Sequence, residues 1–252
     1  MQNHVILQAT THRPYPLARG PWLMRQSWHE LLFIHWPLMP EQIRAKVPEP
    51  LEIDMYGTET WIGIVPFRMS HVRPHLLPSF PPLSNFPELN VRVYVTYQGR
   101  PGVYFFSLEA GNPIAVQIAR TAFHLPYMNA QMECKQDQSE IHYYSRRTHK
   151  GEPPAEFAAR YQPIAPIEYA ETGSLASWFT ERYCLYATAG THLYRAEIHH
   201  VQWPLQKATL EITTNTMATA HGIQLPATQP QLHYSERQDV LVWPPHRLHQ
   251  VS

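Results

Sequence analysis

The stretch that most constrains the fold is residues 88–112, ELNVRVYVTYQGRPGVYFFSLEAGN, which has the pattern of a β-hairpin. In its first arm, hydrophobic and polar residues alternate, with Val91, Val93 and Val95 on one face. The residues QGRP between the two arms favour a tight turn, and a turn this short joins antiparallel strands. We therefore predict at least one pair of long antiparallel strands.

Strand patterns with short connections recur along the chain, and helical patterns are few. We expect helices at 40–47, 112–123 and 174–183, the last two capped by Asn112 and Ser174. Further strands are expected at 51–56, 59–69, 127–135, 140–147, 184–188, 192–201 and 231–243, while 204–219 fits a helix and a strand equally. Neighbouring strands joined by short turns favour an α+β protein that is mostly antiparallel β.

Length and composition predict a single domain over residues 1–252. A chain of 252 residues can bury one large core, and no sequence period repeats. The proline-rich segments 74–87 and 153–166 also contain many apolar residues. We therefore expect them to be ordered loops laid over one core, and not flexible linkers.

Charge and hydropathy argue against several classes of partner. Twenty basic residues balance twenty acidic ones, and no basic run exceeds Arg146 and Arg147, so we expect no nucleic acid partner. No apolar run is long enough for a signal peptide or a membrane span, so we expect a cytoplasmic protein with no membrane partner. Cys134 and Cys184 lie far apart without a CxxC motif, which argues against a disulfide framework. A homo-oligomer is allowed, because no sequence feature decides the number of subunits.

The polar face of the predicted hairpin is the main candidate for a functional site. With a turn at Gly99 and Arg100, Arg92 would pair with Ser107 and Asn90 with Glu109. One face would then carry Glu88, Asn90, Arg92, Tyr94, Phe105, Ser107 and Glu109. A turn of three residues would break this pairing, because a shift of one residue reverses every side chain.

Two interpretations of this face are open. It is either the solvated side of an ordinary antiparallel sheet or the lining of a pocket. Phe105 and Tyr94 do not suit a solvated face, and two carboxylates beside one arginine suit a neutral pocket that holds a polar ligand. Arg120, in the expected helix 112–123, either reaches solvent or points into the same interior as Arg92, and the orientation of His35 is equally undecided.

The segment WHELLFIHW, residues 28–36, is similar to a zinc-protease helix but lacks its second ligand. That motif needs a histidine four residues after His29, and position 33 is Phe. Neither a glycine-rich phosphate loop nor a serine-hydrolase elbow occurs in the sequence. We therefore predict no metal site and no cofactor.

Six segments resemble the uncharacterised YqjF-like family of bacteria, over nearly the whole chain: RGPWLMRQSWHELLFIHWPL, LEIDMYGTETWIGIVPFRM, FPELNVRVYVTYQGRPGVYFFSLEA, AVQIARTAFHLPY, ERYCLY and HHVQWPLQKA. That family is similar in fold to acetoacetate decarboxylase. The resemblance implies a closed, cone-like, mostly antiparallel β-barrel with a few outer helices and a polar pocket inside. It favours the pocket interpretation, because closure of a sheet leaves one face of each strand inside.

The resemblance does not carry over the decarboxylase chemistry. That chemistry uses a lysine that forms a Schiff base inside the pocket. This chain has only Lys46, Lys135, Lys150 and Lys207, and the segment 111–128, where the lysine would be expected, has none. Of the four, only Lys207 has apolar neighbours in the sequence.

These observations predict a protein that holds a small anionic or carbonyl-bearing molecule in a β-barrel pocket. Arg92 is the predicted charge-pairing group, and Glu88 and Glu109 are the candidate acid–base residues. The other candidate ligand-binding residues are Asn90, Tyr94, Ser107 and Arg120. Two alternatives are a lysine-independent lyase or hydratase that uses the carboxylates, and a non-catalytic structural or ligand-carrier protein, in which Glu88 and Arg92 would pair with each other.

Overall fold

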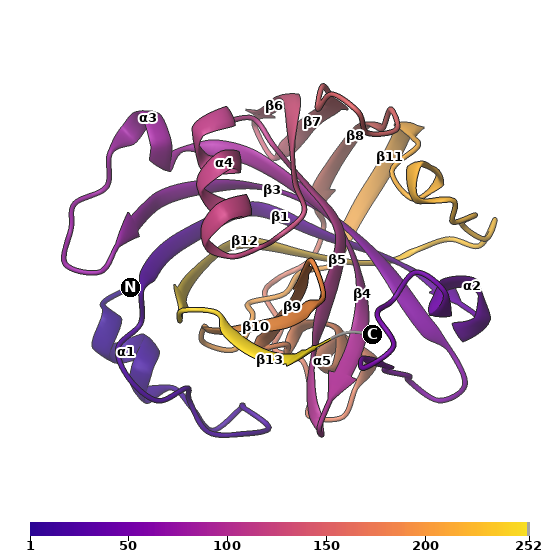
Figure 1. Cartoon of the computed structure of the whole chain (residues 1–252). Helices are drawn as coiled ribbons and strands as arrows, with labels where there is room; N and C mark the ends of the chain where they lie inside the picture. Colours follow the sequence, from indigo (N-terminus) through magenta and orange to yellow (C-terminus); the bar gives the residue numbers. More distant parts are fainter. Residues whose placement is uncertain (251–252) are drawn as a thin grey trace.

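A computed structural model of the chain describes residues 1–250, in which one large sheet dominates and the helices are short (Figure 1). The helices are α1 Asn3–Gln8, α2 Pro40–Arg44, α3 Pro81–Ser84, α4 Pro113–Ala122, α5 Leu175–Thr180 and the 3-10 helix η1 Thr219–His221. The strands are β1 Met24–Leu38, β2 Glu52–Ile53, β3 Thr60–Pro74, β4 Phe86–Tyr97, β5 Arg100–Ala110, β6 Tyr127–Asp137, β7 Glu140–Arg147, β8 Glu156–Pro163, β9 Cys184–Ala189, β10 His192–His199, β11 Ala208–Asn215, β12 Gln231–Val242 and β13 His246–Gln250.

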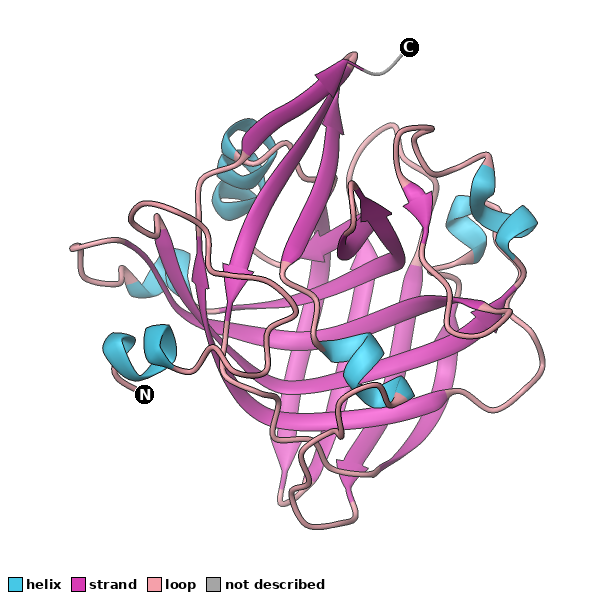
Figure 2. Cartoon of the chain, turned by 90° about the horizontal axis from the view of Figure 1, so that it is seen from below, coloured by secondary structure: helices cyan, strands magenta, loops and turns pink. Residues whose placement is uncertain are grey.

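The sheet is mixed and strongly curved, with short helices around it (Figure 2). Its strands follow the order β11-β8-β7-β6-β5-β9-β10-β12-β1-β3-β4-β2, and β13 pairs with β10. Because β5 also pairs with β4, the pairings from β5 through β9, β10, β12, β1, β3 and β4 return to β5. Among the described strands, β5 is parallel to both β6 and β9, and the other pairs are antiparallel.

Most expected elements are present, and the strands β1, β8 and β13 were not predicted. Asn112 accepts hydrogen bonds from two backbone amides at the start of α4, and Ser174 caps α5, as predicted. The ambiguous segment 204–219 contains strand β11. The zinc-protease-like segment 28–36 lies inside β1, and the proline-rich segment 153–166, expected to be a loop, contains β8.

The predicted pairing of the hairpin is wrong, because its turn lies one residue earlier and a bulge follows. Gln98 and Gly99 both have positive φ (50° and 72°), and the turn closes between Tyr97 and Arg100. Arg92 therefore pairs with Phe105, and these two side chains still share a face. A register shift between Val91 and Arg92 then accommodates one extra residue on β5, which sends Ser107 and Glu109 to the opposite face of the sheet.

Strand β4 is buried on both faces. Its odd-numbered residues from Leu89 to Val95 pack in a hydrophobic core with residues of β7 and β8, such as Tyr143 and Phe157. Tyr94, on the even-numbered face, belongs to a second core, which includes Phe33 of β1 and Phe179 of α5. The alternating residues of β4 thus point into two different cores, and neither face of the strand is turned to solvent.

Gly102 allows the close approach of β5 to β9 and should not tolerate a side chain. A Cβ atom at Gly102 would lie 2.7 Å from Cys184 Cβ, 2.7 Å from Tyr186 Cε2 and closer still to the Cys184 carbonyl oxygen. We expect Gly102→Ala to lower the free energy of unfolding by about 1–3 kcal/mol, because the two strands must move apart. Urea unfolding would measure the loss. Gly111→Ala is the matched control, since its nearest neighbour, Pro87 Cδ, is 3.5 Å away; equal effects of the two substitutions would contradict the prediction.

Candidate functional site

A cavity of about 410 Å³ lies against the even-numbered face of β4. The strands β1, β3, β4 and β5 contribute about half of its lining residues, and most of the others come from the segment 75–84, helix α4 and the segment 179–203. Most lining side chains are apolar or aromatic. The charged or titratable ones are Glu88, Arg92, Tyr127, Arg182 and His200.

Arg92 places an unpaired positive charge in this apolar cavity. Its Nη2 donates a hydrogen bond of 3.2 Å to Tyr94 Oη, and its Nε is buried without a partner among the described residues. The guanidinium carbon lies 5.2 Å from the centre of the Phe33 ring. Among the described residues, no carboxylate lies within salt-bridge distance of Arg92, although acidic residues pair with several other arginines. A cation in apolar surroundings without a counter-ion is costly, so this group favours an anion beside it.

Tyr94 and His35 hold Arg92 from behind the cavity wall. The Tyr94 hydroxyl lies 2.5 Å from His35 Nε2, and His35 stacks on Phe179 with ring centres 3.8 Å apart. Burial, followed by the positive charge of Arg92, keeps the pKa of His35 well below its ordinary value, so the ring is neutral. Tyr94 Oη accepts a hydrogen bond from Arg92 and shares a second one with His35. His35 is outside the cavity lining and orients Arg92 through Tyr94.

The other titratable groups of the cavity do not cancel the charge of Arg92. Arg182 pairs with Asp54, and its Nε donates to the Trp178 carbonyl oxygen at 2.5 Å, so its own charge is balanced. Burial lowers the pKa of His200 to about 3, which leaves this ring neutral at pH 7. Arg182 and His200 therefore add no net charge to the cavity, and Arg92 leaves it positive when Glu88 is protonated.

Glu88 is a buried carboxyl group held by Tyr127. The Tyr127 hydroxyl donates a 2.7 Å hydrogen bond to Glu88 Oε2. Burial raises the pKa of Glu88 to about 8, so most of it is protonated at pH 7. Next to it on the same face, Asn90 Oδ1 is buried and accepts no hydrogen bond from any other residue within 1–250. Glu88 and Asn90 thus offer a proton donor and an acceptor to a molecule in the cavity.

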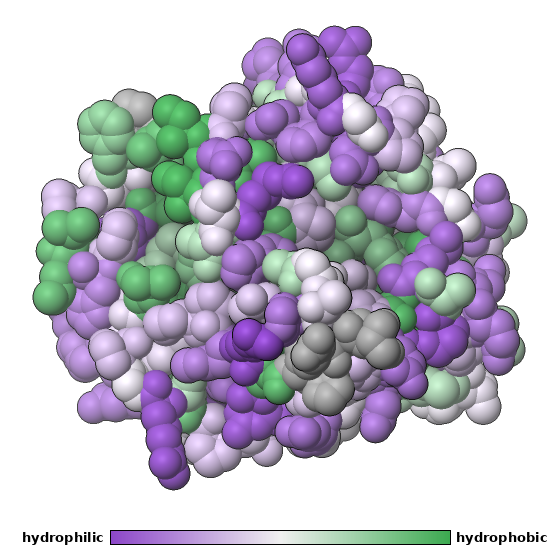
Figure 3. Space-filling view, in the orientation of Figure 1, coloured by the Kyte–Doolittle hydropathy of each residue, from purple (hydrophilic) through white to green (hydrophobic). Residues whose placement is uncertain are grey.

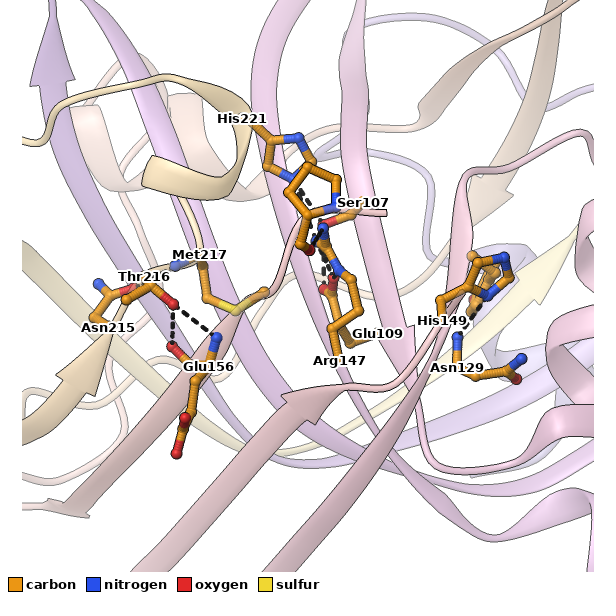
Figure 4. A network of polar contacts seen from close by, with 12 residues as sticks. Ser107, Glu109, Asn129, Arg147, His149, Glu156, Asn215, Thr216, Met217 and His221 are labelled. Carbon is orange, nitrogen blue, oxygen red and sulfur yellow. Dashed lines mark hydrogen bonds and ion pairs between the residues drawn. The ribbon is translucent and has the colours of Figure 1, made fainter. Parts of the chain in front are cut away.

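Glu109 and Ser107 do not line the cavity, which corrects the predicted set. Glu109 pairs with Arg147 at 2.5 Å, and the two side chains are 0% and 1% exposed. Ser107 donates to Glu109 and lies 3.1 Å from both Arg147 Nη2 and His221 Nε2 (Figure 4). This closed network lies on the opposite face of β5, because of the bulge. It is a structural ion pair and not part of the cavity.

Arg120 lines a second hollow, of about 320 Å³, together with His124 and Glu152. Its Nη1 donates a 2.7 Å hydrogen bond to the Tyr127 carbonyl oxygen. Phe105 and Leu125 line both hollows and so form the wall between them. Arg120 therefore does not reach Arg92.

Several cavity residues carry no sequence signal that we recognised. Arg182 follows α5, Tyr127 opens β6, and Trp28 and Phe33 come from the unrecognised strand β1. Alternation alone would place Trp28 and Phe33 on opposite faces of β1; an irregularity between His29 and Ile34, where Glu30 has a φ of 48°, brings both to the cavity. Arg182 and Tyr127 come from distant segments that only the tertiary structure brings to β4.

All four lysines are exposed, and none lines either hollow. Within residues 1–250, no three His, Cys, Asp or Glu side chains are close enough together to hold a metal ion. The helices of the same region are all too short or too polar to span a membrane.

Comparisons with known proteins agree on the family and the fold. Residues 25–239 match the family DUF2071, described as an uncharacterised conserved protein. The chain is 49% identical over 225 residues to the uncharacterised protein YqjF of Bacillus subtilis, covering 89% of this chain and 92% of that protein.

Two solved structures have the same fold at low sequence identity. The enduracididine biosynthesis enzyme MppR complexed with pyruvate has a TM-score of 0.63 at 10% identity and covers 94% of both chains. The acetoacetate decarboxylase of Legionella pneumophila has a TM-score of 0.62 at 12% identity, over 98% of this chain and 96% of that chain. The likeness shows the acetoacetate decarboxylase-like fold.

Glu88→Gln should remove a pH dependence of stability. Because burial raises the pKa of Glu88 from 4.5 to about 8, the folded protein keeps a proton that the unfolded chain releases between these values. The stabilisation is complete below the unfolded pKa and is lost as pH rises through the folded pKa, by up to about 1.4 kcal/mol per pH unit. The substituted amide cannot ionise and still accepts from Tyr127, so the variant should be more stable than the wild type at pH 8 and above.

Urea unfolding between pH 5 and pH 9 would measure this difference. Glu49→Gln, at an exposed position, is the control that should follow the wild-type curve. Parallel curves for the wild type and Glu88→Gln would show that Glu88 is ionised throughout this range.

Proposed function

Because the chain belongs to the DUF2071 family of uncharacterised conserved proteins, we propose its function from the cavity: it binds a small anionic or carbonyl-bearing molecule, with Arg92 pairing with the negative charge. The observation that carries this proposal is the guanidinium of Arg92, which lies in an apolar cavity without a carboxylate partner among the described residues. Arginine presents two parallel donors to a carboxylate, and its charge persists in an apolar environment.

The neighbouring groups suit an anion that also carries a carbonyl or hydroxyl group. Protonated Glu88 can donate to an oxygen of the ligand, and Asn90 Oδ1 can accept a hydrogen bond. The structure of MppR, which has a similar fold, was solved with pyruvate, a small oxo acid, and this supports a similar use of the cavity here.

As part of the same proposal, the run of pairings that returns to β5 makes a closed, cone-like barrel around the ligand. The free thiols Cys134 and Cys184 support a reducing, cytoplasmic setting.

A second candidate function is lysine-independent acid–base catalysis, as in a lyase or hydratase. The observation that favours it is the raised pKa of Glu88, about 8, since a catalytic acid or base works best when its pKa lies near the operating pH. Glu88 would be the catalytic group and Arg92 the group that orients the substrate carboxylate. The corrected position of Glu109 removes it as a second carboxylate for this chemistry.

Arg92→Met should lose ligand binding without loss of stability. A charge-assisted contact contributes about 1.5–3 kcal/mol, so affinity for carboxylates should fall about 10- to 100-fold. The free energy of unfolding should change by less than about 1 kcal/mol, because no acidic partner is left unpaired. Titration calorimetry with pyruvate, acetoacetate and hexanoate, and native mass spectrometry of molecules retained by the purified protein, would test this.

Two control variants separate binding from structure. Arg160→Met, at an exposed position, should leave both properties unchanged. Arg147→Met should lose about 3–5 kcal/mol of stability, because it leaves Glu109 buried and unpaired. Equal carboxylate affinities of wild type and Arg92→Met would overturn the proposed function.

Borohydride reduction in the presence of acetoacetate or pyruvate should yield no covalent adduct. Schiff-base formation needs an uncharged amine in the cavity, and the four lysines of this chain are all exposed. Intact-mass measurement after reduction would detect an adduct. An adduct mapped to Lys207 would show instead that the protein is a lysine-dependent enzyme.

A further inference from the structure

The cavity is long, and its two ends differ in chemistry. Its lining residues on β4 are Phe86, Glu88, Asn90 and Arg92, which succeed one another at every second position. Six residues of strand rise about 20 Å in total, so this wall extends about 20 Å from Phe86 to Arg92. The neighbouring strand β3 pairs with β4 along this length, with Met69 opposite Phe86 and Gly63 opposite Arg92.

Arg92 lies at the inner end of this length. Gly63 lets the His35 ring and Arg92 pack closely against β3, since a Cβ placed there would lie 3.1 Å from His35 Nε2 and 3.4 Å from Arg92 Cγ. The chain reverses at the other end, where β3 stops at Pro74 and β4 begins at Phe86. The charged group is therefore far from the turn that joins these strands.

The outer end is an apolar mouth between the segment 75–84 and helix α4. Three side chains that line the cavity are also largely exposed there: Leu77 (55%), Phe80 (62%) and Ile118 (53%). Figure 3 shows apolar surface gathered over the region of α3 and α4. Between this mouth and Glu88 the wall is formed by apolar side chains, among them Met69, Phe86, Ala115, Ala119 and Phe123.

A molecule as small as pyruvate would leave most of this length filled with water against apolar walls, which is unfavourable. Resting on the proposed function, we infer that the ligand is an amphiphilic carboxylate, with its carboxylate at Arg92 and an unbranched aliphatic tail that runs past Glu88 and along α4 to the mouth. The tail accounts for the exposed apolar residues at the mouth, which otherwise face water. Glu88, protonated in these apolar surroundings, does not repel the carboxylate.

A series of straight-chain carboxylates tests the inference by titration calorimetry. Acetate, butyrate, hexanoate, octanoate and decanoate, each used well below the concentration at which it self-associates, should bind the wild type with rising affinity. Burial of one methylene contributes about 0.8 kcal/mol, which corresponds to about a fourfold gain per methylene. The gain should continue up to decanoate, because its tail is shorter than the wall of about 20 Å.

Two variants on α4 test the route of the tail. Ala119 lines the cavity, whereas Ala122, on the same helix, is exposed and outside the lining. Ala119→Phe should lower decanoate affinity at least tenfold and leave butyrate affinity unchanged, and Ala122→Phe should change neither. A length dependence that Ala119→Phe does not alter would overturn the route along α4, and the wild-type series is informative even if this variant fails to fold.

The outcomes also separate the inference from the proposed function. Binding that depends on Arg92 but not on chain length would overturn the amphiphilic ligand and leave the proposed function intact. Binding of the series that is equal in the wild type and in Arg92→Met would overturn both.

Discussion

The burial of strand β4 on both faces is the constraint on which the site depends. Its valines fill one hydrophobic core, so the strand cannot turn without exposing them. The opposite face must then point into the second interior, and this face carries Glu88, Asn90 and Arg92. The packing of the valines in one core thus fixes the positions of Glu88, Asn90 and Arg92 in the other.

Two interior arginines show how differently the fold treats the same side chain. Arg147 meets Glu109 and Ser107 in a closed network, so its charge is neutralised within the protein. Among the described residues, Arg92 donates only to the hydroxyl oxygen of Tyr94, which also forms a hydrogen bond with His35. Arg92 therefore offers an anion a site inside the cavity, because no carboxylate of the described residues neutralises its charge. Arg147 is the comparison, since a carboxylate does neutralise that interior arginine.

The sequence supported much of the architecture because the relevant signals are local. The caps at Asn112 and Ser174 depend on a few neighbouring residues, and both helices begin where they were expected. Strand β1 was not predicted because its four consecutive apolar residues, LLFI, do not alternate with polar ones. Strand β8 was not predicted because it lies between prolines, which are more typical of loops. The turn of the hairpin was misplaced for a subtler reason: Gln98 adopts a left-handed conformation that its residue type does not favour.

The sequence by itself determined that Glu88, Asn90 and Arg92 share one face of a strand, because side chains alternate with a period of two, and that no lysine accompanies them. The tertiary structure decided which side chains join them. One extra residue in β5 sent Glu109 and Ser107 to the other interior, while Tyr127, Arg182 and the wall of α4 arrived from segments far along the chain. The pairing of charges was also decided there, since a carboxylate neutralises an arginine only when the fold brings the two within contact distance.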